Sequence, residues 1–488
     1  MAPITAKEII EATGGKLLSI NSKSPEYKEK LFHNFRGVSI DSRTISGGEV
    51  FFALRGERFN GHDFLKEALL RSDGAVIDSE YPPLPEGKII IYVEDTLKAL
   101  QDLAYFLRAG RNIPVIAITG SNGKTTTKEM TYAILSRKFK VIKNEGNLNN
   151  HIGLPLSLTR LSPDDEVIVL ELGMNAPGEI RKLCDIAVPS HGIITNIGSA
   201  HIGKLGDLDS VRRAKLEILQ GLAVIVLNAD DGFLMQGYEA VRRQEGFDGR
   251  LITFSINPVR KPGGGFLSNG VNNDSDVSAE NVVATDNGSN FTLRLKDGRS
   301  IALTLNVQGL FNVYNALTAS AVCLSLGITV EEIKTALKEY KAFPMRFEII
   351  KRNKMTLIDD SYNANPSSVE AALKELVRMR GSGRVVAVLG DMFELGEFSE
   401  KAHSDVVEMV SAMGVNVFIG VGEMMSSAAE ASKKMMGEKS LPAVYSFRGV
   451  NEASRDIMDI LKDGDTVLVK GSRAMGMEKI VNLISQIK

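Results

Sequence analysis

The stretch PVIAITGSNGKTTT, residues 114–127, decides the fold that we expect for this chain. Residues 114–119 are almost continuously apolar, which is typical of a strand buried on both faces of a parallel sheet. Glycines follow at once, and TKEMTYAILSR, residues 127–137, has the character of a helix. A strand, a glycine loop and a helix in this order place backbone N–H groups and a helix N-terminus where a polyphosphate can bind. The stretch therefore predicts an α/β fold with a nucleotide site at the loop.

The loop supplies the residue types that grip ATP. Lys124 provides a positive charge for the β- and γ-phosphate oxygens, and the Thr125 hydroxyl is placed for a magnesium ion. The common pattern G-x-x-x-x-G-K-[ST] is not met literally, because Ile118 occupies the slot of its first glycine. An ordinary strand-to-helix turn with a solvated lysine is the alternative. We interpret the loop as a shorter variant whose ATP-binding residues are Gly120, Ser121, Asn122, Gly123, Lys124, Thr125 and Thr126.

Outward from the loop, the chain is predicted to form three domains, because 488 residues exceed what one hydrophobic core usually serves. Residues 1–110 mix short strands such as EVFFAL with helices, which predicts a small α/β domain. Residues 111–342 alternate apolar strands such as EVIVLEL and AVIVLN with helices, which predicts a mostly parallel sheet. Its ATP site should lie at the carboxyl ends of the strands. Residues 343–488 restart the alternation and predict a Rossmann-like domain without a G-x-G-x-x-G fingerprint.

Two further segments of the predicted central domain have a clear local character. The segment RKPGGGFLSNGVNNDSD, residues 260–276, is rich in glycine and asparagine and predicts a surface loop. The segment FTLRLKDGRSIALTL, residues 291–305, alternates around Asp297 and Gly298 and predicts a β-hairpin. A helix is expected to follow over residues 311–327.

Composition excludes several classes of protein. The chain has 58 Lys and Arg against 60 Asp and Glu, a net charge of −2, so nothing in the overall balance favours a nucleic-acid partner. Cys184 and Cys323 lie far apart without metal-ligand spacing, which fits core packing in a reducing compartment. No run of about 18 apolar residues predicts a membrane span, and the N-terminus lacks the features of a signal peptide. We therefore expect a cytoplasmic enzyme.

Nine segments in order resemble the Mur ligase family, the amide-forming enzymes of cell-wall precursor synthesis. They read GSNGKTTTKE, GNLNNHIGLPLSL, ELGMNAPGEI, TNIGSAHIGKLG, RRAKLEIL, QGLFNVYNALTA, FPMRFE, DDSYNANPSS and LGDMFELG. DSYNANPSS and GDMFELGE are most similar to the branch that adds D-alanyl-D-alanine. The stretch SIDSRTISGGEVFFALRGERFNGHDF resembles the UDP-sugar-binding domain of two members of the family. The resemblance spans essentially the whole chain.

The resemblance implies a reaction and its partners. ATP would phosphorylate the terminal carboxylate of a UDP-N-acetylmuramoyl-tripeptide, and the amine of D-Ala-D-Ala would attack the acyl phosphate, releasing phosphate. The reaction must bring together two anions, the carboxylate of the tripeptide and the triphosphate of ATP. Two magnesium ions and Lys124 would neutralise their charge, while the loop would hold the reacting groups in position. The family leads us to expect a monomer. Whether the tripeptide ends in lysine or diaminopimelate is left open.

The resemblance also assigns metal and catalytic roles. Glu171 ends the strand EVIVLEL, where a carboxylate at the sheet's carboxyl edge suits a hard cation. His201 in NIGSAHIG would be a ligand of the second metal ion. Lys215 in RRAKLEIL would be carbamylated, so that a cation becomes a carboxylate supporting the magnesium site. Lys124, Lys215, His201 and Arg346 are the expected catalytic residues.

Substrate and nucleotide contacts are expected from three regions. Asn312 and Asn315 lie three apart on one helix face and so can act together; the resemblance implies that they frame the base of ATP. Arg346 would reach the γ-phosphate from the third domain, and Asp360 would contact the ribose or phosphate side, with Tyr362 near the substrate. The remaining candidates are Ser42 and Arg43 for the uridine diphosphate, and Asn147, Asn149 and Asn150 for the peptide substrate.

Three alternatives remain open. Folylpolyglutamate synthase shares the phosphate loop and the acyl-phosphate chemistry, but that family begins almost directly at its ATP domain. The tripeptide-forming Mur ligase is closer, yet its D-x-A-H-x-P and D-N-P-R segments are not found, and DSYNANP occupies the first slot. A nucleotide-sensing protein without covalent chemistry would bind ATP without turnover.

Overall fold

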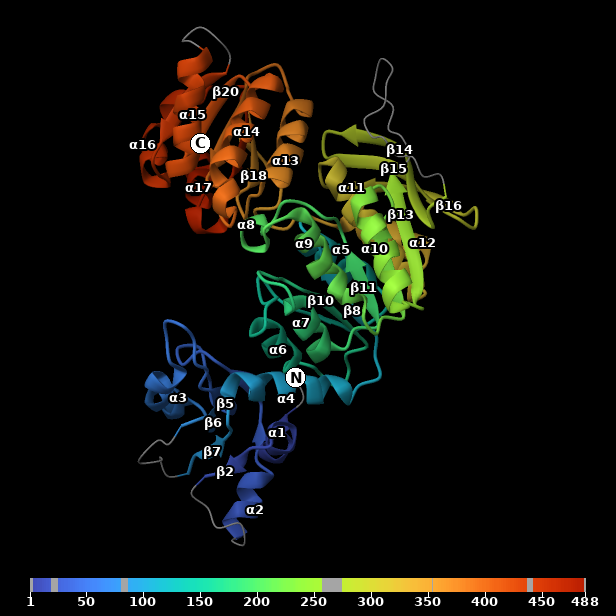
Figure 1. Cartoon of the computed structure of the whole chain (residues 1–488), viewed down its shortest axis with the longest axis vertical. Coiled ribbons are helices and arrows are strands. Elements are labelled where there is room, and N and C mark those ends of the chain that lie inside the picture. The colour runs from blue at the N-terminus through green and yellow to red at the C-terminus, as the bar shows by residue number, and fades with distance from the viewer. Residues whose placement is uncertain are drawn as a thin grey trace.

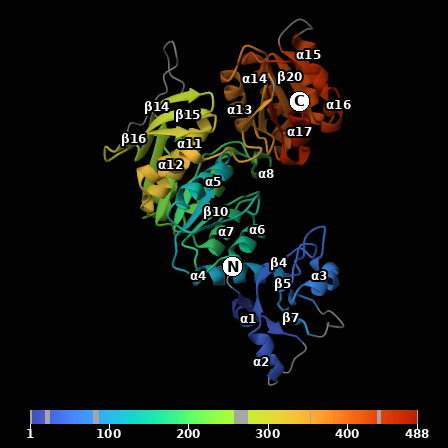
Figure 2. The same cartoon turned by 180° about the vertical axis from the view of Figure 1, so that it is seen from behind.

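The computed structural model describes residues 3–18, 25–79, 87–256, 274–352, 354–436 and 442–486. Three α/β domains follow one another along the chain. In Figure 1 the amino-terminal domain lies at one end of the molecule, and the central and carboxy-terminal domains lie side by side at the other. The view from behind in Figure 2 shows the same arrangement, with α4 between the amino-terminal and central domains.

The amino-terminal domain is built on a five-stranded sheet with the order β2-β7-β6-β5-β4. Strands β4 to β7 are parallel, whereas β2 pairs antiparallel with β7. Its strands are β1 (Ile4–Thr5), β2 (Lys16–Leu17), β3 (Asn34–Phe35), β4 (Gly37–Ser39), β5 (Glu49–Phe52), β6 (Gly74–Ile77) and β7 (Ile89–Tyr92). Its helices are α1 (Ala6–Thr13), α2 (Pro25–Leu31), η1 (Gly61–Phe64), α3 (Leu65–Arg71) and α4 (Thr96–Ala109). Leu156 of the central domain packs into one of the two hydrophobic cores of the amino-terminal domain. The two domains are therefore connected by this packing as well as by α4.

The central domain contains a nine-stranded sheet with the order β16-β15-β14-β13-β12-β11-β8-β10-β9. It is parallel from β9 to β14 and ends in two antiparallel strands. The strands are β8 (Val115–Thr119), β9 (Val141–Lys143), β10 (Val167–Glu171), β11 (His191–Ile194), β12 (Val224–Asn228), β13 (Arg250–Ile256), β14 (Val277–Thr285), β15 (Gly288–Leu295) and β16 (Ser300–Leu305). The helices are α5 (Lys124–Leu135), α6 (Gly153–Leu158), α7 (Glu179–Ala187), α8 (Ile202–Leu205), α9 (Leu208–Leu216), η2 (Glu217–Leu219), α10 (Gly232–Glu245), α11 (Leu310–Ser325) and α12 (Val330–Glu339).

Burial on both faces explains the sequence of the central strands. All five residues of β8 are buried, and alternate residues enter two separate cores. Ile116 and Ile118 face the core under α5 and α11, whereas Val115 and Ala117 face the core under α6, α7 and α9. The predicted hairpin is confirmed as β15 and β16, but most of the predicted surface loop at 260–276 lies outside the described residues.

The carboxy-terminal domain has a six-stranded sheet with the order β17-β18-β22-β19-β20-β21. Only the β17–β18 pairing is antiparallel. Its strands are β17 (Glu348–Arg352), β18 (Met355–Asp360), β19 (Val385–Gly390), β20 (Val417–Val421), β21 (Ala443–Phe447) and β22 (Thr466–Lys470). Its helices are α13 (Pro366–Arg378), η3 (Gly396–Phe398), α14 (Ser399–Ala412), α15 (Glu423–Met436), α16 (Val450–Ile460), η4 (Arg473–Met475) and α17 (Glu478–Ser485). The predicted α/β class with a central parallel sheet is confirmed.

The central and carboxy-terminal domains meet where α13 faces α11 (Figures 1 and 2). They also meet where α8 contacts η3 and the residues before it. Glu375 of α13 accepts a hydrogen bond from the backbone of Leu310, and Arg378 donates to Gln308. At α8, the Gly203 N–H donates to the Glu394 carbonyl at 3.1 Å. A Cβ on Gly203 would lie 2.2 Å from the nitrogen of Gly396, so two backbones touch here without room for a side chain.

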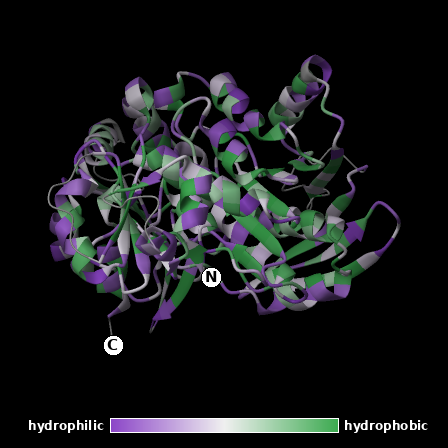
Figure 3. Cartoon of the chain, turned by 90° about the horizontal axis from the view of Figure 1, so that it is seen from below, coloured by the Kyte–Doolittle hydropathy of each residue, from purple (hydrophilic) through white to green (hydrophobic). Residues whose placement is uncertain are grey.

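Figure 3 shows hydrophobic residues concentrated in the strands and hydrophilic residues on the outer sides of the helices, as expected for sheets covered by amphipathic helices. Among the described residues, no helix is both long and apolar enough to cross a membrane.

Candidate active site

A cavity of about 740 Å³ lies at the carboxyl ends of the central strands and continues against the carboxy-terminal domain. The loops after β8, β10 and β11 line one side of it, while β18, the start of α13 and the end of β22 line the other. Its lining includes sixteen of the predicted residues: Ser121, Asn122, Gly123, Lys124, Thr125, Thr126, Asn147, Asn149, Asn150, Glu171, His201, Asn312, Asn315, Arg346, Asp360 and Tyr362. Gly120, Lys215, Ser42 and Arg43 are not in that lining.

The phosphate loop takes a shape that requires glycine at two positions. Gly120 has φ +148° and Gly123 has φ +81°, values that side-chain-bearing residues rarely adopt. A Cβ on Gly120 would lie 1.9 Å from Thr195 Oγ1, and one on Gly123 would lie 2.4 Å from Asn315 Oδ1. Gly123 therefore caps α5 closely against the asparagine of α11, and the first-turn N–H groups of α5 have no intrahelical acceptor. Such an end is suited to an anion.

Thr125 and Glu171 form a pair of hard oxygen donors at the start of α5. The Thr125 hydroxyl donates to Glu171 Oε2 at 2.9 Å, and both side chains are almost fully buried. The other carboxylate oxygen of Glu171 accepts from Asn149 Nδ2 at 2.9 Å. Oxygen ligands of this kind suit magnesium, so the residues fit one such ion here.

Lys124 and Lys215 point at the same backbone oxygen. Their Nζ atoms lie 2.8 Å and 3.0 Å from the Gly120 carbonyl oxygen. Burial lowers the pKa of Lys124, an effect that the negative charge of Glu171 opposes. Burial, aided by the charge of Lys124, lowers the pKa of Lys215 well below its usual value. A neutral amine at Lys215 is the form that reacts with electrophiles.

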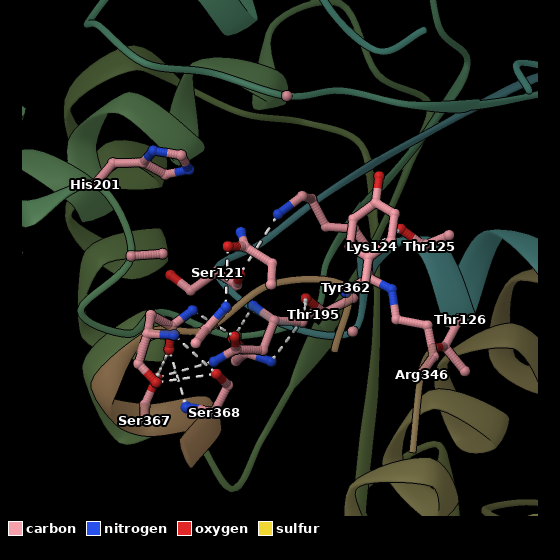
Figure 4. Close-up of a pocket in the computed structure, with 18 of the residues that line it drawn as sticks. Ser121, Lys124, Thr125, Thr126, Thr195, His201, Arg346, Tyr362, Ser367 and Ser368 are labelled. Atoms are coloured by element: carbon pink, nitrogen blue, oxygen red, sulfur yellow. Dashed lines mark hydrogen bonds between the residues drawn. The ribbon is translucent and has the colours of Figure 1, made fainter. Parts of the chain in front are cut away.

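His201 is turned toward the carboxy-terminal domain. Its Nδ1 lies 2.7 Å from Glu394 Oε2, and contact with His201 lowers the pKa of Glu394 to about 2. In Figure 4, His201 lies on the opposite side of Lys124 and Ser121 from Thr125 and Arg346. Within the described ranges, no three His, Cys, Asp or Glu side chains form a group that could hold a metal. The structure thus brings Thr125 and Glu171 together, whereas His201, the ligand predicted for the second ion, is paired with Glu394 instead.

Arg346 reaches the phosphate loop from the start of the carboxy-terminal domain. Its Nη2 donates to Thr125 Oγ1 at 3.0 Å, and its guanidinium lies 3.7 Å from the centre of the Tyr362 ring (Figure 4). Its neighbours Met345 and Phe347 have φ +61° and +55°, so the backbone is strained on both sides of it. The fold therefore places the guanidinium beside Thr125 at a cost in backbone energy.

Asp360 at the end of β18 is held by two partners. Lys470 Nζ lies 2.6 Å from its Oδ2, and the Phe347 N–H donates to its Oδ1 at 3.1 Å. Lys470 lines the cavity but was missed in the sequence, although its position at the end of the strand DTVLVKG could have identified it. The Asp360 carboxylate and the Lys470 ammonium form an ion pair at the carboxyl ends of β18 and β22.

The predicted asparagines make specific contacts. On α11, Asn315 Nδ2 donates to Asn312 Oδ1 at 3.0 Å, and both side chains are buried, as the spacing of three predicts. Asn150 Oδ1 accepts from the backbone of Ile152 and Gly153 at the start of α6. Asn149 contacts Glu171, so its side chain supports the carboxylate in this structure. Asn147 lines the cavity.

Ser42 and Arg43 lie in the amino-terminal domain, after β4. Ser42 is buried and its hydroxyl donates to Glu67 Oε2 at 3.3 Å. Arg43 is exposed and pairs with Asp41, whose pKa its guanidinium lowers to about 2. The structure leaves Arg43 accessible to an anionic ligand at the surface.

Comparison with known proteins places this geometry in a family. Three sequence families match in order: "Mur ligase family, catalytic domain" over residues 34–106, "Mur ligase middle domain" over 118–323, and "Mur ligase, glutamate ligase domain" over 345–473. The UDP-N-acetylmuramoyl-tripeptide–D-alanyl-D-alanine ligase of Bacillus subtilis (strain 168) is 34% identical, over 98% of this chain and 97% of the relative.

Two solved structures are similar over most of their length. A structure of MurF from Acinetobacter baumannii has 30% identity and a TM-score of 0.84, covering 99% of both chains. The MurF ligase from Thermotoga maritima in complex with ADP has 26% identity and a TM-score of 0.77, covering 92% of this chain and 97% of that one. This chain belongs to the Mur ligase family.

Proposed function

We propose that this chain is an ATP-dependent, ADP-forming ligase that joins D-alanyl-D-alanine to UDP-N-acetylmuramoyl-tripeptide. The observation that carries the proposal is the meeting of Lys124, Arg346 and the Thr125–Glu171 pair in one cavity formed by two domains. The near full-length relatives bear the name of this activity. The product, a UDP-N-acetylmuramoyl-pentapeptide, is a precursor of peptidoglycan.

The first proposed step transfers the γ-phosphoryl group of ATP to the terminal carboxylate of the tripeptide. The first-turn N–H groups of α5 and the Lys124 ammonium hold the phosphates, and Arg346 lies where a second cation can meet the γ-phosphate. Asn312 and Asn315 would frame the base, with Asp360 on the ribose or phosphate side. Thr125 and Glu171 would hold a magnesium ion, which would neutralise charge between the two anions.

The second proposed step forms the amide bond. The D-Ala-D-Ala amine attacks the acyl carbon, the bond to the phosphate oxygen breaks, and the amine loses a proton as phosphate leaves. Burial of the site between two domains keeps water from the acyl phosphate. Asn147, Asn150 and Tyr362 line the space where the peptide would lie. Ser42 and Arg43 are proposed to meet the uridine diphosphate, with the exposed guanidinium as the anion contact.

Lys215 is proposed to carry a carbamate. Its neutral amine nitrogen attacks the carbon of CO2, an N–C bond forms, and one N–H proton passes to solvent, leaving an anion. The lowered pKa of Lys215 favours this reaction because it increases the unprotonated fraction of the amine. The carbamate would support the magnesium site from beneath the phosphate loop, and His201 would join a second ion if it leaves Glu394. We further propose that the enzyme acts in the cytoplasm as a monomer.

One assay tests the function. Phosphate release is measured with ATP, magnesium and each substrate alone, then with both together, using tripeptides that end in lysine and in diaminopimelate. We expect release and pentapeptide formation only when the tripeptide and D-Ala-D-Ala are both present. Two results would contradict the proposal. One is phosphate release with other substrates, such as a folate as the carboxylate and glutamate as the acceptor amine. The other is binding of ATP without phosphate release.

A further inference from the structure

The side chain of Asn122 crosses from the phosphate loop to the carboxy-terminal domain. Its Nδ2 donates to Ser367 Oγ at 2.9 Å, and its Oδ1 accepts from Asn365 Nδ2 at 2.8 Å. The dashed lines near Ser367 and Ser368 in Figure 4 belong to this group of contacts. Both the amide nitrogen and the amide oxygen of Asn122 therefore form hydrogen bonds to the carboxy-terminal domain.

The backbone of the same residue is fixed within the central domain. The Asn122 N–H donates to Asn196 Oδ1 at 3.0 Å, and its carbonyl accepts from Thr195 Oγ1 at 2.6 Å. These partners follow β11, so the loop that would grip the phosphates is tied to the central sheet. A shift of the loop backbone would move the side-chain amide with it.

The partners in the carboxy-terminal domain are equally fixed. Asn365 caps α13, because its Oδ1 accepts from the Ser368 N–H at 2.9 Å while its Nδ2 serves Asn122. Ser367 Oγ also donates to Asn365 Oδ1 at 2.9 Å. On the central side, a Cβ on Gly198 would lie 2.9 Å from Ser367 Oγ, so the domains approach closely at this point. The hydrogen bonds thus join two rigid elements.

We infer that Asn122 is a positioning residue that couples nucleotide binding at the phosphate loop to closure of the carboxy-terminal domain. The inference rests on the proposed function, because it assumes that the loop binds a nucleotide. Nucleotide that orders the loop aligns the Asn122 amide with α13, and closure of α13 in turn holds the loop in its binding shape. Such coupling is reciprocal, so closure strengthens nucleotide binding by the same factor.

A second contact between the same domains provides a matched control. Arg378 Nη2 donates to Gln308 Oε1 at 3.0 Å, where α13 ends beside the start of α11. Neither residue lines the cavity, and neither contacts the phosphate loop through a described hydrogen bond. This contact should stabilise the closed arrangement with and without nucleotide to the same extent.

The test measures closure without turnover. Exposed Lys182 and Lys433 are replaced by cysteine for a pair of fluorescent dyes, since Cys184 and Cys323 are buried and burial raises the pKa of both thiols. Energy transfer is recorded with and without a non-hydrolysable ATP analogue and magnesium. We expect the nucleotide to raise the closed fraction of the unsubstituted enzyme. Ser367→Ala should reduce the nucleotide-induced change in the closure equilibrium constant about fivefold, the factor expected from one hydrogen bond. Asn122→Ala, which removes two hydrogen bonds between the domains, should reduce it at least as much.

The double variant and the control decide the interpretation. Asn122→Ala with Ser367→Ala should lose no more coupling than Asn122→Ala alone, because Asn122→Ala already removes the hydrogen bond to Ser367 together with the one from Asn365. Arg378→Gln should lower the closure equilibrium constant by the same factor with and without nucleotide, and so leave the coupling intact. Ser367→Ala leaves the loop chemically unchanged, so unaltered coupling in that variant would overturn the inference. If the unsubstituted enzyme binds no nucleotide, the inference and the proposed function both fail.

Discussion

Lys215 illustrates how burial gives an ordinary side chain an unusual reactivity. Its amine is enclosed beneath the phosphate loop, beside the charge of Lys124, and its pKa is lowered well below the usual value. It therefore stays unprotonated at pH values where an exposed lysine is a cation. As pH falls through the lowered pKa, the amine gains a proton and can no longer react with CO2.

We predict that Lys215→Ala lowers activity about 100-fold or more, and that short carboxylic acids such as acetate restore part of it by occupying the position of the carbamate. In the unsubstituted enzyme, activity in CO2-depleted buffer should fall more steeply toward low pH and recover with bicarbonate. Enzyme assays and the carbamate signal from ¹³C-labelled bicarbonate in NMR check both points. Full activity of Lys215→Ala, or no response to carboxylic acids, would contradict the carbamate.

Asn149 and Asn150 are adjacent residues with separable effects. Asn149 donates to Glu171 Oε1, whereas Asn150 Oδ1 accepts from the backbone N–H groups of Ile152 and Gly153 at the start of α6. We predict that Asn149→Ala raises the magnesium concentration needed for half-maximal activity about tenfold, because a partner that orients a ligand carboxylate is lost. Asn150→Ala should instead lower the free energy of unfolding by about 1 kcal/mol. Magnesium titrations and denaturant unfolding of both variants distinguish the two roles. If Asn149→Ala needed the same magnesium concentration for half-maximal activity as the unsubstituted enzyme, the role of Asn149 would be contradicted.

At the scale of elements, the turn from β8 to α5 depends on a helix that lies about 190 residues further along the chain. Gly123 is the N-cap of α5 and has φ +81°, and the space where its side chain would be is filled by Asn315 of α11. Two restrictions therefore act on the same residue. One is steric and comes from α11, and the other is conformational and belongs to the turn itself.

We predict that Gly123→Ala weakens ATP binding about tenfold or more, since a Cβ would lie 2.4 Å from Asn315 Oδ1. Adding Asn315→Ala should relieve the steric part but not the strain of the positive φ, so the double variant should recover incompletely. Calorimetric titration with ATP in the single and double variants tests this. Complete recovery would mean that the turn itself tolerates a side chain.

Elements with strong internal patterns were predictable from sequence. The apolar runs around β8, β10 and β12 identify buried parallel strands, and alternation around Asp297 identifies the β15–β16 hairpin. Strand β17 was missed because it is a partly exposed strand at the edge of its sheet, without a buried apolar run. The four-residue helix α8 was also missed, since so short a segment has no period to read.

At the scale of the whole molecule, Arg346 makes the site a property of two domains. It reaches Thr125 from the carboxy-terminal domain and stacks on Tyr362. We predict that Arg346→Lys lowers kcat about 100-fold while KM for ATP changes less than tenfold, because a lysine keeps the charge but not the planar, stacked fork. Steady-state kinetics provide the measurement. A rise in KM for ATP without loss of kcat would indicate a binding role alone.

Sixteen of the residues predicted for the site line the cavity, whereas the connections of the cavity between domains could not be predicted. Glycines, Lys124 and Thr125 belong to one local sequence, and resemblance to a family carried most of the others. The contacts from Glu394 to His201 and from Asn122 to Ser367 join residues more than 190 positions apart. No local pattern encodes them, because they depend on how two folded domains pack against each other.

The contact between Gly203 and Gly396 has a genetic consequence. Neither residue carries a functional group, yet a single added methyl at Gly203 would meet the backbone of the other domain. In a library in which every codon is varied and growth is selected, Gly203 should be as intolerant of change as Lys124. Sensitivity to mutation in this enzyme would then mark the places where its domains touch as clearly as the atoms that take part in the reaction.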